Sequence, residues 1–311
     1  MNNLKKTKEA FSAGSISKAE FITQMHECHQ QLFDYVDELN NCNLCGISIT
    51  RLELVAEFAD PNIKMICPRV DNRIAPIEAF NFGSFEFKEI RAVSKIVGLL
   101  GGRAAKIFDV GANAGFYSLA LASYFNGITG VAFEPVPLTY SYLKRNFEIN
   151  YVQGINALNI GLSDAPGQLS FAVAEDHSGA SFIAIKADEI NSQLVKCDVT
   201  TIDDFVAQSG IFPDFIKCDV EGAELLVFKG ARNLFTNKQP VVFTEMLRKW
   251  AKKFDYHPND IIKYFSDLGY LCFVIRDEKL ISFTCVGDDT LDTNYIFLHG
   301  ENHSNIISNL C

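Results

Sequence analysis

The chain has 311 residues, of which 48% are hydrophobic and 21% are charged, and its formal net charge is -10. This length and composition suit one large α/β domain with an appendage, or two modest domains. The acidic surface repels phosphate backbones, so we expect no nucleic-acid partner. The sequence has no apolar run of the roughly 18 residues that a membrane span needs and no apolar export signal at its start. We therefore expect a cytoplasmic protein without a membrane span.

Nine cysteines are scattered through the chain. Three of them, Cys218, Cys272 and Cys285, lie in apolar surroundings that are typical of buried free thiols, which indicates a reducing compartment. Near the amino terminus, a group of histidines and cysteines resembles a zinc set; its members are His26, Cys28, His29, Cys42 and Cys45. A helix would turn Cys28 away from the two histidines, and the apolar pattern explains the cysteines as core. We expect no metal site.

Residues 1–80 are predicted to form a helical extension or cap. The stretch ISKAEFITQMHECHQQLFDYVDEL has helical apolar periodicity, and Ser17 with Glu20 would make a capping box at its start. A second periodic run, ITRLELVAEFA, is predicted to be helical, and residues 61–84 to be an irregular connection. The extension is a candidate for covering the cofactor, shaping the acceptor pocket or forming a homo-oligomer.

Residues 81–311 are predicted to form an α/β domain. The stretch FGSFEFKEIRAVSKIVGLL reads as an entry helix, after which strand-like and helix-like segments alternate. The predicted strands are AKIFDV, GVAFEP, INALNIGLSD, DFIKCDVEG, QPVVFTEM, YLCFVIRD, KLISFTC and NYIFLHG, with GQLSFAVA as a hairpin arm. Such alternation predicts parallel βαβ units in a doubly wound sheet.

A glycine-rich turn follows the first of these strands. Its pattern is D-x-G-x-x-x-G, formed by Asp109, Gly111 and Gly115, and Asn113 stands where a dinucleotide-binding turn has its second glycine. A side chain there disfavours a pyrophosphate, and no Gly-Lys-Ser/Thr follows as in a phosphate loop. The turn suits a ligand with an amino-acid end, whose ammonium Asp109 would hold directly or through water.

Polar residues end the next two strands. Glu134 is placed to accept both hydroxyls of a ribose, and Ser163 or Asp164 would meet an adenine amino group. Asp109 and Glu134 together fit a nucleoside that carries an amino acid, and S-adenosylmethionine is such a ligand. The alternatives are that Asp109 caps the following helix, that Glu134 is a solvated charge and that Ser163-Asp164 is a plain turn.

The motifs DVGANAGFYS, AFEPVP, LNIGLSD, VTTIDDF, DFIKCDVEGAELLVFKGA and PVVFTE occur in the order found in the FkbM-type S-adenosylmethionine-dependent methyltransferases, which this chain resembles over about residues 80–275. The resemblance implies a class I methyltransferase fold, with a mostly parallel seven-stranded sheet whose last strand is antiparallel. It implies O-methylation of hydroxyls on sugars, glycans or related metabolites. It also implies cofactor contacts from Asp109, Gly111, Asn113, Gly115, Phe116, Glu134, Pro135, Ser163, Asp164 and Asp219, and Glu86 is a further candidate in the entry helix.

Methyl transfer to a hydroxyl benefits from a base that takes the proton. Lys217, Asp219 and Glu221 alternate along the predicted fourth strand, so we expect them to point to one side as the catalytic group, with Glu224 nearby. His177, in a polar loop, is a second candidate base. The alternative is a helix cap with a surface lysine, and a divalent ion on Asp219 and Glu221 is a further possibility.

On the acceptor side, Glu245 would hold hydroxyls, and an aromatic platform would come from Trp250, Tyr256 and His257, although core packing also explains these rings. The competing functions are a nicotinamide oxidoreductase, an N-methyltransferase and a non-catalytic partner protein. The first is disfavoured by Asn113. The second would show an Asn/Asp-Pro-Pro-aromatic tetrad where this chain has CDVEG. A non-catalytic partner protein would not need Asp109, Glu134 and Asp219 together.

Overall fold

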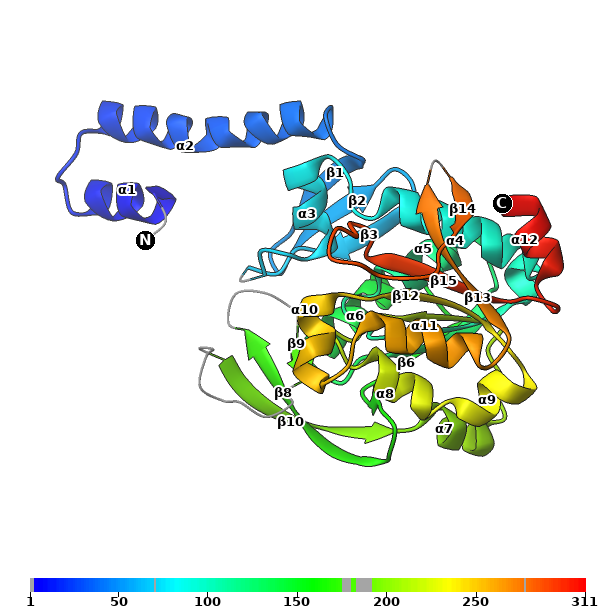
Figure 1. Ribbon diagram of the computed structural model, residues 1–311. Helices are drawn as coiled ribbons and strands as arrows, with labels where there is room; N and C mark the ends of the chain where they lie inside the picture. Colours follow the sequence, from blue (N-terminus) through cyan, green and yellow to red (C-terminus); the bar gives the residue numbers. More distant parts are fainter. Residues whose placement is uncertain (1–2, 70, 175–179, 183–191, 277) are drawn as a thin grey trace.

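A computed structural model describes residues 3–69, 71–174, 180–182, 192–276 and 278–311. At its amino end, α1 (Asn3–Ser12) and α2 (Lys18–Leu39) form a helical hairpin that projects away from an α/β body (Figure 1). The predicted capping box is confirmed: the Ser17 hydroxyl accepts from the Glu20 amide, and the Glu20 carboxylate accepts from the Ser17 amide.

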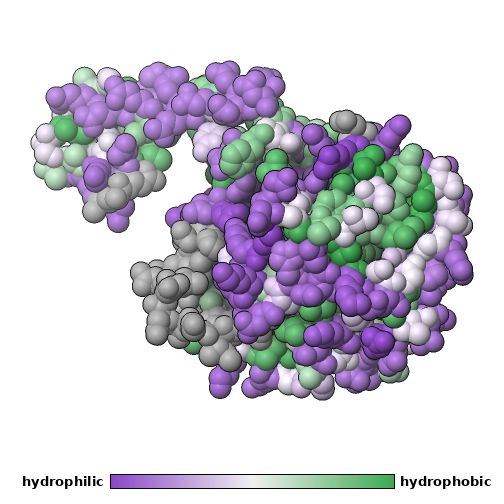
Figure 2. Space-filling model, in the orientation of Figure 1, coloured by the Kyte–Doolittle hydropathy of each residue, from purple (hydrophilic) through white to green (hydrophobic). Residues whose placement is uncertain are grey.

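The helical hairpin makes little contact with the body. None of the residues of α2 is buried, and Figure 2 shows mainly hydrophilic residues on its visible face. Phe11 and Phe21 stack at a centroid distance of 4.3 Å, which joins the two helices. Several large apolar side chains of α2 remain exposed, namely Ile22, Leu32, Phe33 and Val36. A homo-oligomer through these helices stays a prediction.

Two predictions for the remainder of the amino-terminal extension are wrong. The run at 49–59 is not a helix, because it contains β2 (Leu54–Phe58), which pairs with β1 (Leu44–Ile49) and β3 (Ile63–Ile66) in an antiparallel sheet. The expected irregular connection contains β3 and α3 (Ala75–Phe82). Phe58 and Met65 are buried in the same apolar cluster as α5, so pairing and burial override the helical periodicity.

The body is built on an eight-stranded sheet in the order β14-β13-β15-β12-β11-β4-β5-β6. The strands are β4 (Lys106–Val110), β5 (Thr129–Phe133), β6 (Ile155–Leu158), β11 (Phe215–Cys218), β12 (Val241–Glu245), β13 (Tyr270–Arg276), β14 (Lys279–Ser282) and β15 (Asn294–His299). Strands β6, β5, β4, β11 and β12 are parallel, and β15 is antiparallel to both of its neighbours. The doubly wound class I topology is confirmed, and β14 extends the expected seven strands by one at the edge.

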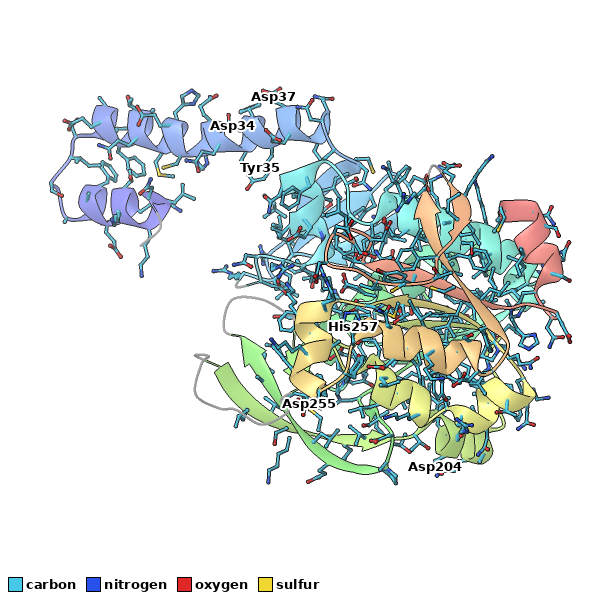
Figure 3. All side chains as sticks on the ribbon, viewed as in Figure 1. Asp34, Tyr35, Asp37, Asp204, Asp255 and His257 are labelled. Carbon is cyan, nitrogen blue, oxygen red and sulfur yellow. The ribbon has the colours of Figure 1, made fainter. Side chains whose placement is uncertain are left out.

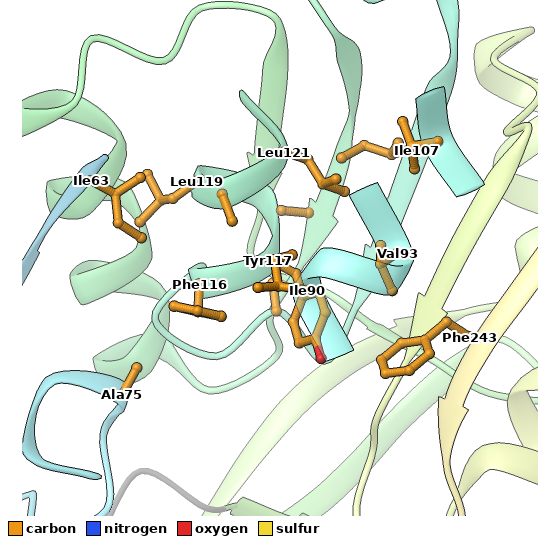
Figure 4. Close-up of a cluster of buried hydrophobic side chains, with 14 of the residues drawn as sticks. Ile63, Ala75, Ile90, Val93, Ile107, Phe116, Tyr117, Leu119, Leu121 and Phe243 are labelled. Carbon is orange, nitrogen blue, oxygen red and sulfur yellow. The ribbon is translucent and has the colours of Figure 1, made fainter. Parts of the chain in front are cut away.

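Helices cover both faces of this sheet. One face is covered by α4 (Phe87–Leu99), α5 (Phe116–Tyr124) and α6 (Pro137–Ile149), and the other by α7 (Ile202–Ser209), α8 (Glu224–Lys229), α9 (Arg232–Asn237) and α11 (Pro258–Ser266). Consecutive residues alternate between the two cores: Ile107 packs with α4 and α5, whereas Phe108 packs with the opposite helices. Figure 4 shows the first core, with Ile90 and Tyr117 close together.

A smaller sheet in the order β7-β10-β8-β9 extends from the body (Figure 1). Its strands are β7 (Gly161–Leu162), β8 (Gly167–Ala174), β9 (Ala180–Phe182) and β10 (Ser192–Thr200). The predicted third strand is therefore two strands, β6 and β7, in different sheets. The predictions did not include β10, α7 or four short elements, which are η1 (Gly102–Ala104), α10 (Arg248–Ala251), η2 (Lys252–Phe254) and α12 (Ser304–Leu310).

All nine cysteines, which lie in the described ranges, are free. Cys218 and Cys272 are buried as expected, but Cys285 is exposed because it lies in the irregular segment after β14. Among the described residues there is no helix long and apolar enough to cross a membrane. In the same part of the chain, no three His, Cys, Asp or Glu side chains are grouped to hold a metal ion.

Candidate active site

The candidate site lies at the carboxyl ends of β4, β5, β11 and β12, the edge where doubly wound sheets bind ligands. The side chains gathered there include Asp109, Glu134, Asp219 and Glu245. They come from neighbouring strands, since β4 pairs with both β5 and β11, and β11 pairs with β12. The topology alone thus brings together residues that are far apart in the sequence.

Asp109 connects the end of β4 to the following helix. Its Oδ2 accepts hydrogen bonds from the Ser118 hydroxyl at 2.6 Å and the Ser118 amide at 3.2 Å. Its Oδ1 is buried and has no hydrogen-bond partner in the described part of the chain; Lys217 Nζ lies 3.7 Å from it. A buried acceptor without a donor is costly. One oxygen of Asp109 therefore supports α5, and the other is available to a donor such as an ammonium.

The turn after β4 needs glycine for reasons of packing. Gly111 and Gly115 have φ values of +69° and +93°, in the left-handed region that favours glycine. A Cβ on Gly111 would lie 1.9 Å from the carbonyl oxygen of Asp219, and one on Gly115 would lie 2.5 Å from Leu143. Gly111 thus permits close approach of two strand-end loops, a role that the sequence analysis missed.

Glu134 is held in place by the backbone of its neighbours. Its Oε2 accepts from the Asn113 amide at 3.0 Å, and its Oε1 accepts from the Val136 amide at 2.9 Å. Burial raises the pKa of Glu134 to about 7, although these two N–H groups act in the opposite direction. Glu134 is buried, which excludes the solvated strand-end charge. A carboxylate has about four lone-pair sites, so its oxygens can also accept from two hydroxyls.

The remaining predicted cofactor residues are divided between surface and core. Ser163 is buried and its hydroxyl donates to Asp164, which is exposed. Ser163 and Pro135 line a small cavity with Gly111 and apolar residues of the smaller sheet. Phe116 packs in the core, 4.9 Å from Phe85 between ring centroids.

Lys217, on β11, is a buried cation in the centre of the site. Its Nζ donates to the Gly111 carbonyl at 2.8 Å and lies 3.5 Å from Asp219 and 3.7 Å from Asp109. Burial by itself lowers the pKa of Lys217, but the carboxylates of Asp219, Asp109 and Glu86 outweigh burial, and the pKa is raised. Lys217 therefore stays protonated and positions the glycine turn, rather than serving as a base.

The predicted fourth strand is too long. It ends at Cys218, and residues 219–223 form a turn in which Glu221 has a φ of +54° and Gly222 one of +106°. Glu221 therefore does not continue a strand alternation with Lys217. The turn is supported by Glu224, whose Oε1 accepts from the Val220 and Gly222 amides at 3.1 and 3.0 Å.

Carboxyl groups around the turn have raised proton affinity. Burial, followed by the charge of Asp219, raises the pKa of Glu221. Burial also raises the pKa of Glu245 well above its usual range, with further contributions from Asp219 and Glu221. Glu86 accepts a short hydrogen bond from the Tyr117 hydroxyl, and burial raises its pKa to about 7. Crowded, partly buried carboxyls of this kind are suited to proton transfer near neutral pH.

Other predicted residues are dispersed. His177 lies outside the described residues. Tyr256 donates to the Gly222 carbonyl at 2.8 Å, so its hydroxyl supports the turn. His257 is exposed, and its Nδ1 accepts from the Asn259 amide at the start of α11. Figure 3 labels His257 on the ribbon. Trp250 is partly exposed, with its ring flanked by lysines.

The sequence analysis missed Tyr117, Arg73, Lys249 and Lys253, all of which lie at or near the site. The only sequence signal for Tyr117 is that it follows the glycine turn directly. No sequence signal identifies Arg73, Lys249 or Lys253 as site residues. Arg73 precedes the predicted domain, and the two lysines follow its fifth parallel strand, outside the motifs.

Two cavities adjoin the glycine turn. One, of about 30 Å³, is lined by Gly111, Pro135 and Ser163. The other, of about 80 Å³, is lined by Glu86, Asn113, Lys217, Asp219 and Arg73. The orphaned Oδ1 of Asp109 and the oriented oxygens of Glu134 are acceptors that suit the ammonium and the ribose hydroxyls of a nucleoside with an amino-acid end. The donor set thus agrees with S-adenosylmethionine.

Comparisons with known proteins identify the family. The profile of the methyltransferase FkbM domain family matches residues 109–272, more than half of the chain. Methyltransferase sdnD of Sordaria araneosa is 32% identical over 155 residues, which cover 40% of this chain and 59% of that protein. Hexuronic acid methyltransferase AglP of Haloferax volcanii is 29% identical over 154 residues, which cover 48% of this chain and 60% of that protein.

The match thus spans about three fifths of the length of these relatives. Among solved structures, the crystal structure of methyltransferase FkbM from Methylobacillus flagellatus KT is 21% identical, covers 62% of this chain and 43% of its own, and has a TM-score of 0.39. On the strength of the profile match, the chain belongs to the FkbM methyltransferase family.

Proposed function

We propose that the protein is an S-adenosylmethionine-dependent O-methyltransferase that acts on a hydroxyl of a sugar, a glycan or a related small metabolite. The observation that carries this proposal is the arrangement around the glycine turn, where Glu134 is oriented by two backbone amides and Asp109 has an unpaired buried oxygen. The relationship to sdnD and AglP supports methyl transfer, and the description of AglP as a hexuronic acid methyltransferase supports a sugar acceptor.

The residues of the cofactor side have separate tasks in this proposal. Glu134 accepts the ribose hydroxyls, and Asp109 Oδ1 accepts from the ammonium of the methionine end. The Ser163-Asp164 turn, with Pro135, borders the cavity on the adenine side. Lys217 holds the Gly111 carbonyl and neutralises part of the surrounding negative charge. When bound, S-adenosylmethionine supplies an activated methyl group, so alignment is a large part of catalysis.

The acceptor hydroxyl must lose its proton during transfer. Glu221 is our first candidate for the base, because it lies at the turn beyond Asp219 and its pKa is raised by burial and by that neighbour. Glu245 holds a proton more tightly still, so it is suited to donating a hydrogen bond to the acceptor. A positioned base contributes about 10²–10⁴-fold to the rate.

The rival nicotinamide oxidoreductase would bind a dinucleotide at the same turn. In this structure the Asn113 amide is engaged by Glu134, and Asn113 carries a side chain where a pyrophosphate needs glycine. Calorimetric titration with S-adenosylmethionine and with NAD separates the two. We expect binding of S-adenosylmethionine alone, and a loss of about tenfold to a hundredfold in affinity for Glu134→Ala.

The control is Glu301→Ala, which removes an exposed carboxylate near the carboxyl terminus and should leave affinity unchanged. Incubation with labelled S-adenosylmethionine and a panel of nucleotide sugars and lipid-linked glycans then tests the acceptor. Binding of NAD in place of S-adenosylmethionine, or an unchanged affinity in Glu134→Ala, would contradict the proposal.

A further inference from the structure

Three basic side chains from separate elements act on Glu221. Arg73 comes from the connection between β3 and α3, Lys249 from α10 and Lys253 from η2. The charges of all three oppose the rise in the pKa of Glu221, so each lies within electrostatic reach of that carboxyl. Arg73 also lines the cavity that contains Asp219.

The two lysines share the ring of Trp250. Lys253 Nζ lies 3.7 Å and Lys249 Nζ 4.8 Å from the ring centroid. Burial lowers the pKa of Lys253, the charge of Glu221 opposes this, and the charge of Lys249 lowers the pKa further. Two ammonium groups on one indole therefore repel each other, which makes the pair receptive to an anion.

These cations act together on the Glu221 carboxyl and form few ion pairs of their own. No ion pair within the described residues involves Lys249 or Lys253, and Arg73 has only a long contact of 3.9 Å with Glu78. The chain as a whole has a net charge of -10. Three cations that act on one carboxyl, Glu221, leave an excess of positive charge there, which on so acidic a protein indicates a negative ligand.

The indole is fixed relative to the candidate base. A Cβ on Gly222 would lie 2.7 Å from the backbone carbonyl group of Trp250, so α10 packs directly on the turn that contains Glu221. An aromatic face flanked by cations suits a sugar ring that carries an oxyanion, because the ring packs on the indole while the anion meets the basic groups.

We propose that Arg73, Lys249 and Lys253 bind a carboxylate or phosphate group of the acceptor, and that the acceptor's sugar ring packs on Trp250. This inference rests on the proposed function and adds to it that the acceptor is an anionic sugar. Glu221 would then lie between the bound ring and Asp219, on the side of the cofactor.

The chain has one tryptophan, so its fluorescence reports on this surface directly. We would titrate the full-length protein, in the presence of S-adenosylhomocysteine, with glucuronic acid, glucose 6-phosphate and neutral methyl glucoside. A saturable change with glucuronic acid alone indicates a carboxylate acceptor, and one with the phosphate alone indicates a phosphosugar. Either supports the proposal. Equal responses to all three sugars, or no response, would overturn it.

The double variant Lys249→Ala/Lys253→Ala should weaken binding of the anionic sugar by about tenfold. Its matched control is Lys252→Ala, which removes the exposed lysine between them. If the double variant binds the anionic sugar as tightly as the wild type, the proposal is overturned, and the two lysines only pack against the indole. Calorimetry with S-adenosylmethionine on the same samples keeps the two proposals distinct: normal cofactor binding without an anion response defeats this inference alone.

Discussion

The cofactor side and the acceptor side of the site are built differently. On the cofactor side, Asp109 and Glu134 are buried, and backbone amides or a hydroxyl hold both oxygens of Glu134 and one oxygen of Asp109. On the acceptor side, Glu221 and Trp250 are half-buried, and the charged groups around them come from distant segments. The first side is therefore preorganised by the backbone of the fold, whereas the second depends on side chains that can vary without disturbing the sheet.

We expect the largest effect from a substitution on the cofactor side. Gly111→Ala places a Cβ 1.9 Å from the Asp219 carbonyl oxygen, so the two strand-end loops must separate. We expect a loss of about 3–5 kcal/mol in the free energy of unfolding and loss of S-adenosylmethionine binding, measured by denaturation and calorimetry.

Gly210→Ala is the matched control for that experiment. Gly210 has the same φ of +69°, but a Cβ there would meet no atom within 4 Å. Only the conformational cost of about 1–2 kcal/mol should remain. If the two variants lose equal stability, the close approach of the loops is not what requires glycine at 111.

We expect the second-largest effect from a substitution on the acceptor side. Glu221→Gln should lower kcat by about 10²–10⁴-fold, because a glutamine cannot take the proton. In the wild type, turnover should rise as pH rises through a Glu221 pKa that burial and Asp219 have raised. The variant should lose this acidic limb of the pH profile. Full activity with an unchanged profile would make His177 the better candidate.

The smallest effect concerns stability. Since burial raises the pKa of Glu245 in the folded state, folded protein binds this proton more tightly than unfolded protein. Its contribution to stability is present below the unfolded pKa and is lost as pH rises through the folded pKa. Glu245→Gln should therefore become more stable than the wild type by about 1–2 kcal/mol as pH rises from about 5 to about 9. Denaturant unfolding across that range measures it, and Glu301→Gln should follow the wild type.

The same division explains what the sequence could predict. Asp109, Gly111 and Glu134 were identifiable because strand ends and glycine spacing are local signals, and parallel topology brings strand ends together. The turn at 219–223 was mistaken for a strand because Glu221 adopts a positive φ, which the local sequence pattern does not predict. Arg73 and Lys253 become site residues only through tertiary packing, which a single sequence does not encode locally. For the same reason β2 was mistaken for a helix. Its apolar periodicity is compatible with a helix, but pairing with β1 and β3 makes it a strand.

In our proposal the cofactor side and the acceptor side meet between Asp219 and Glu221. The most direct measurement is the S-adenosylmethionine affinity of Asp219→Asn and Glu221→Gln, determined side by side by calorimetry. Asp219 lies 3.5 Å from Lys217 and lines the cavity beside Asn113, so Asp219→Asn should weaken binding by about tenfold. Glu221→Gln should bind the cofactor as the wild type does while turnover falls. Equal losses of affinity in both variants, or none in Asp219→Asn, would contradict the account.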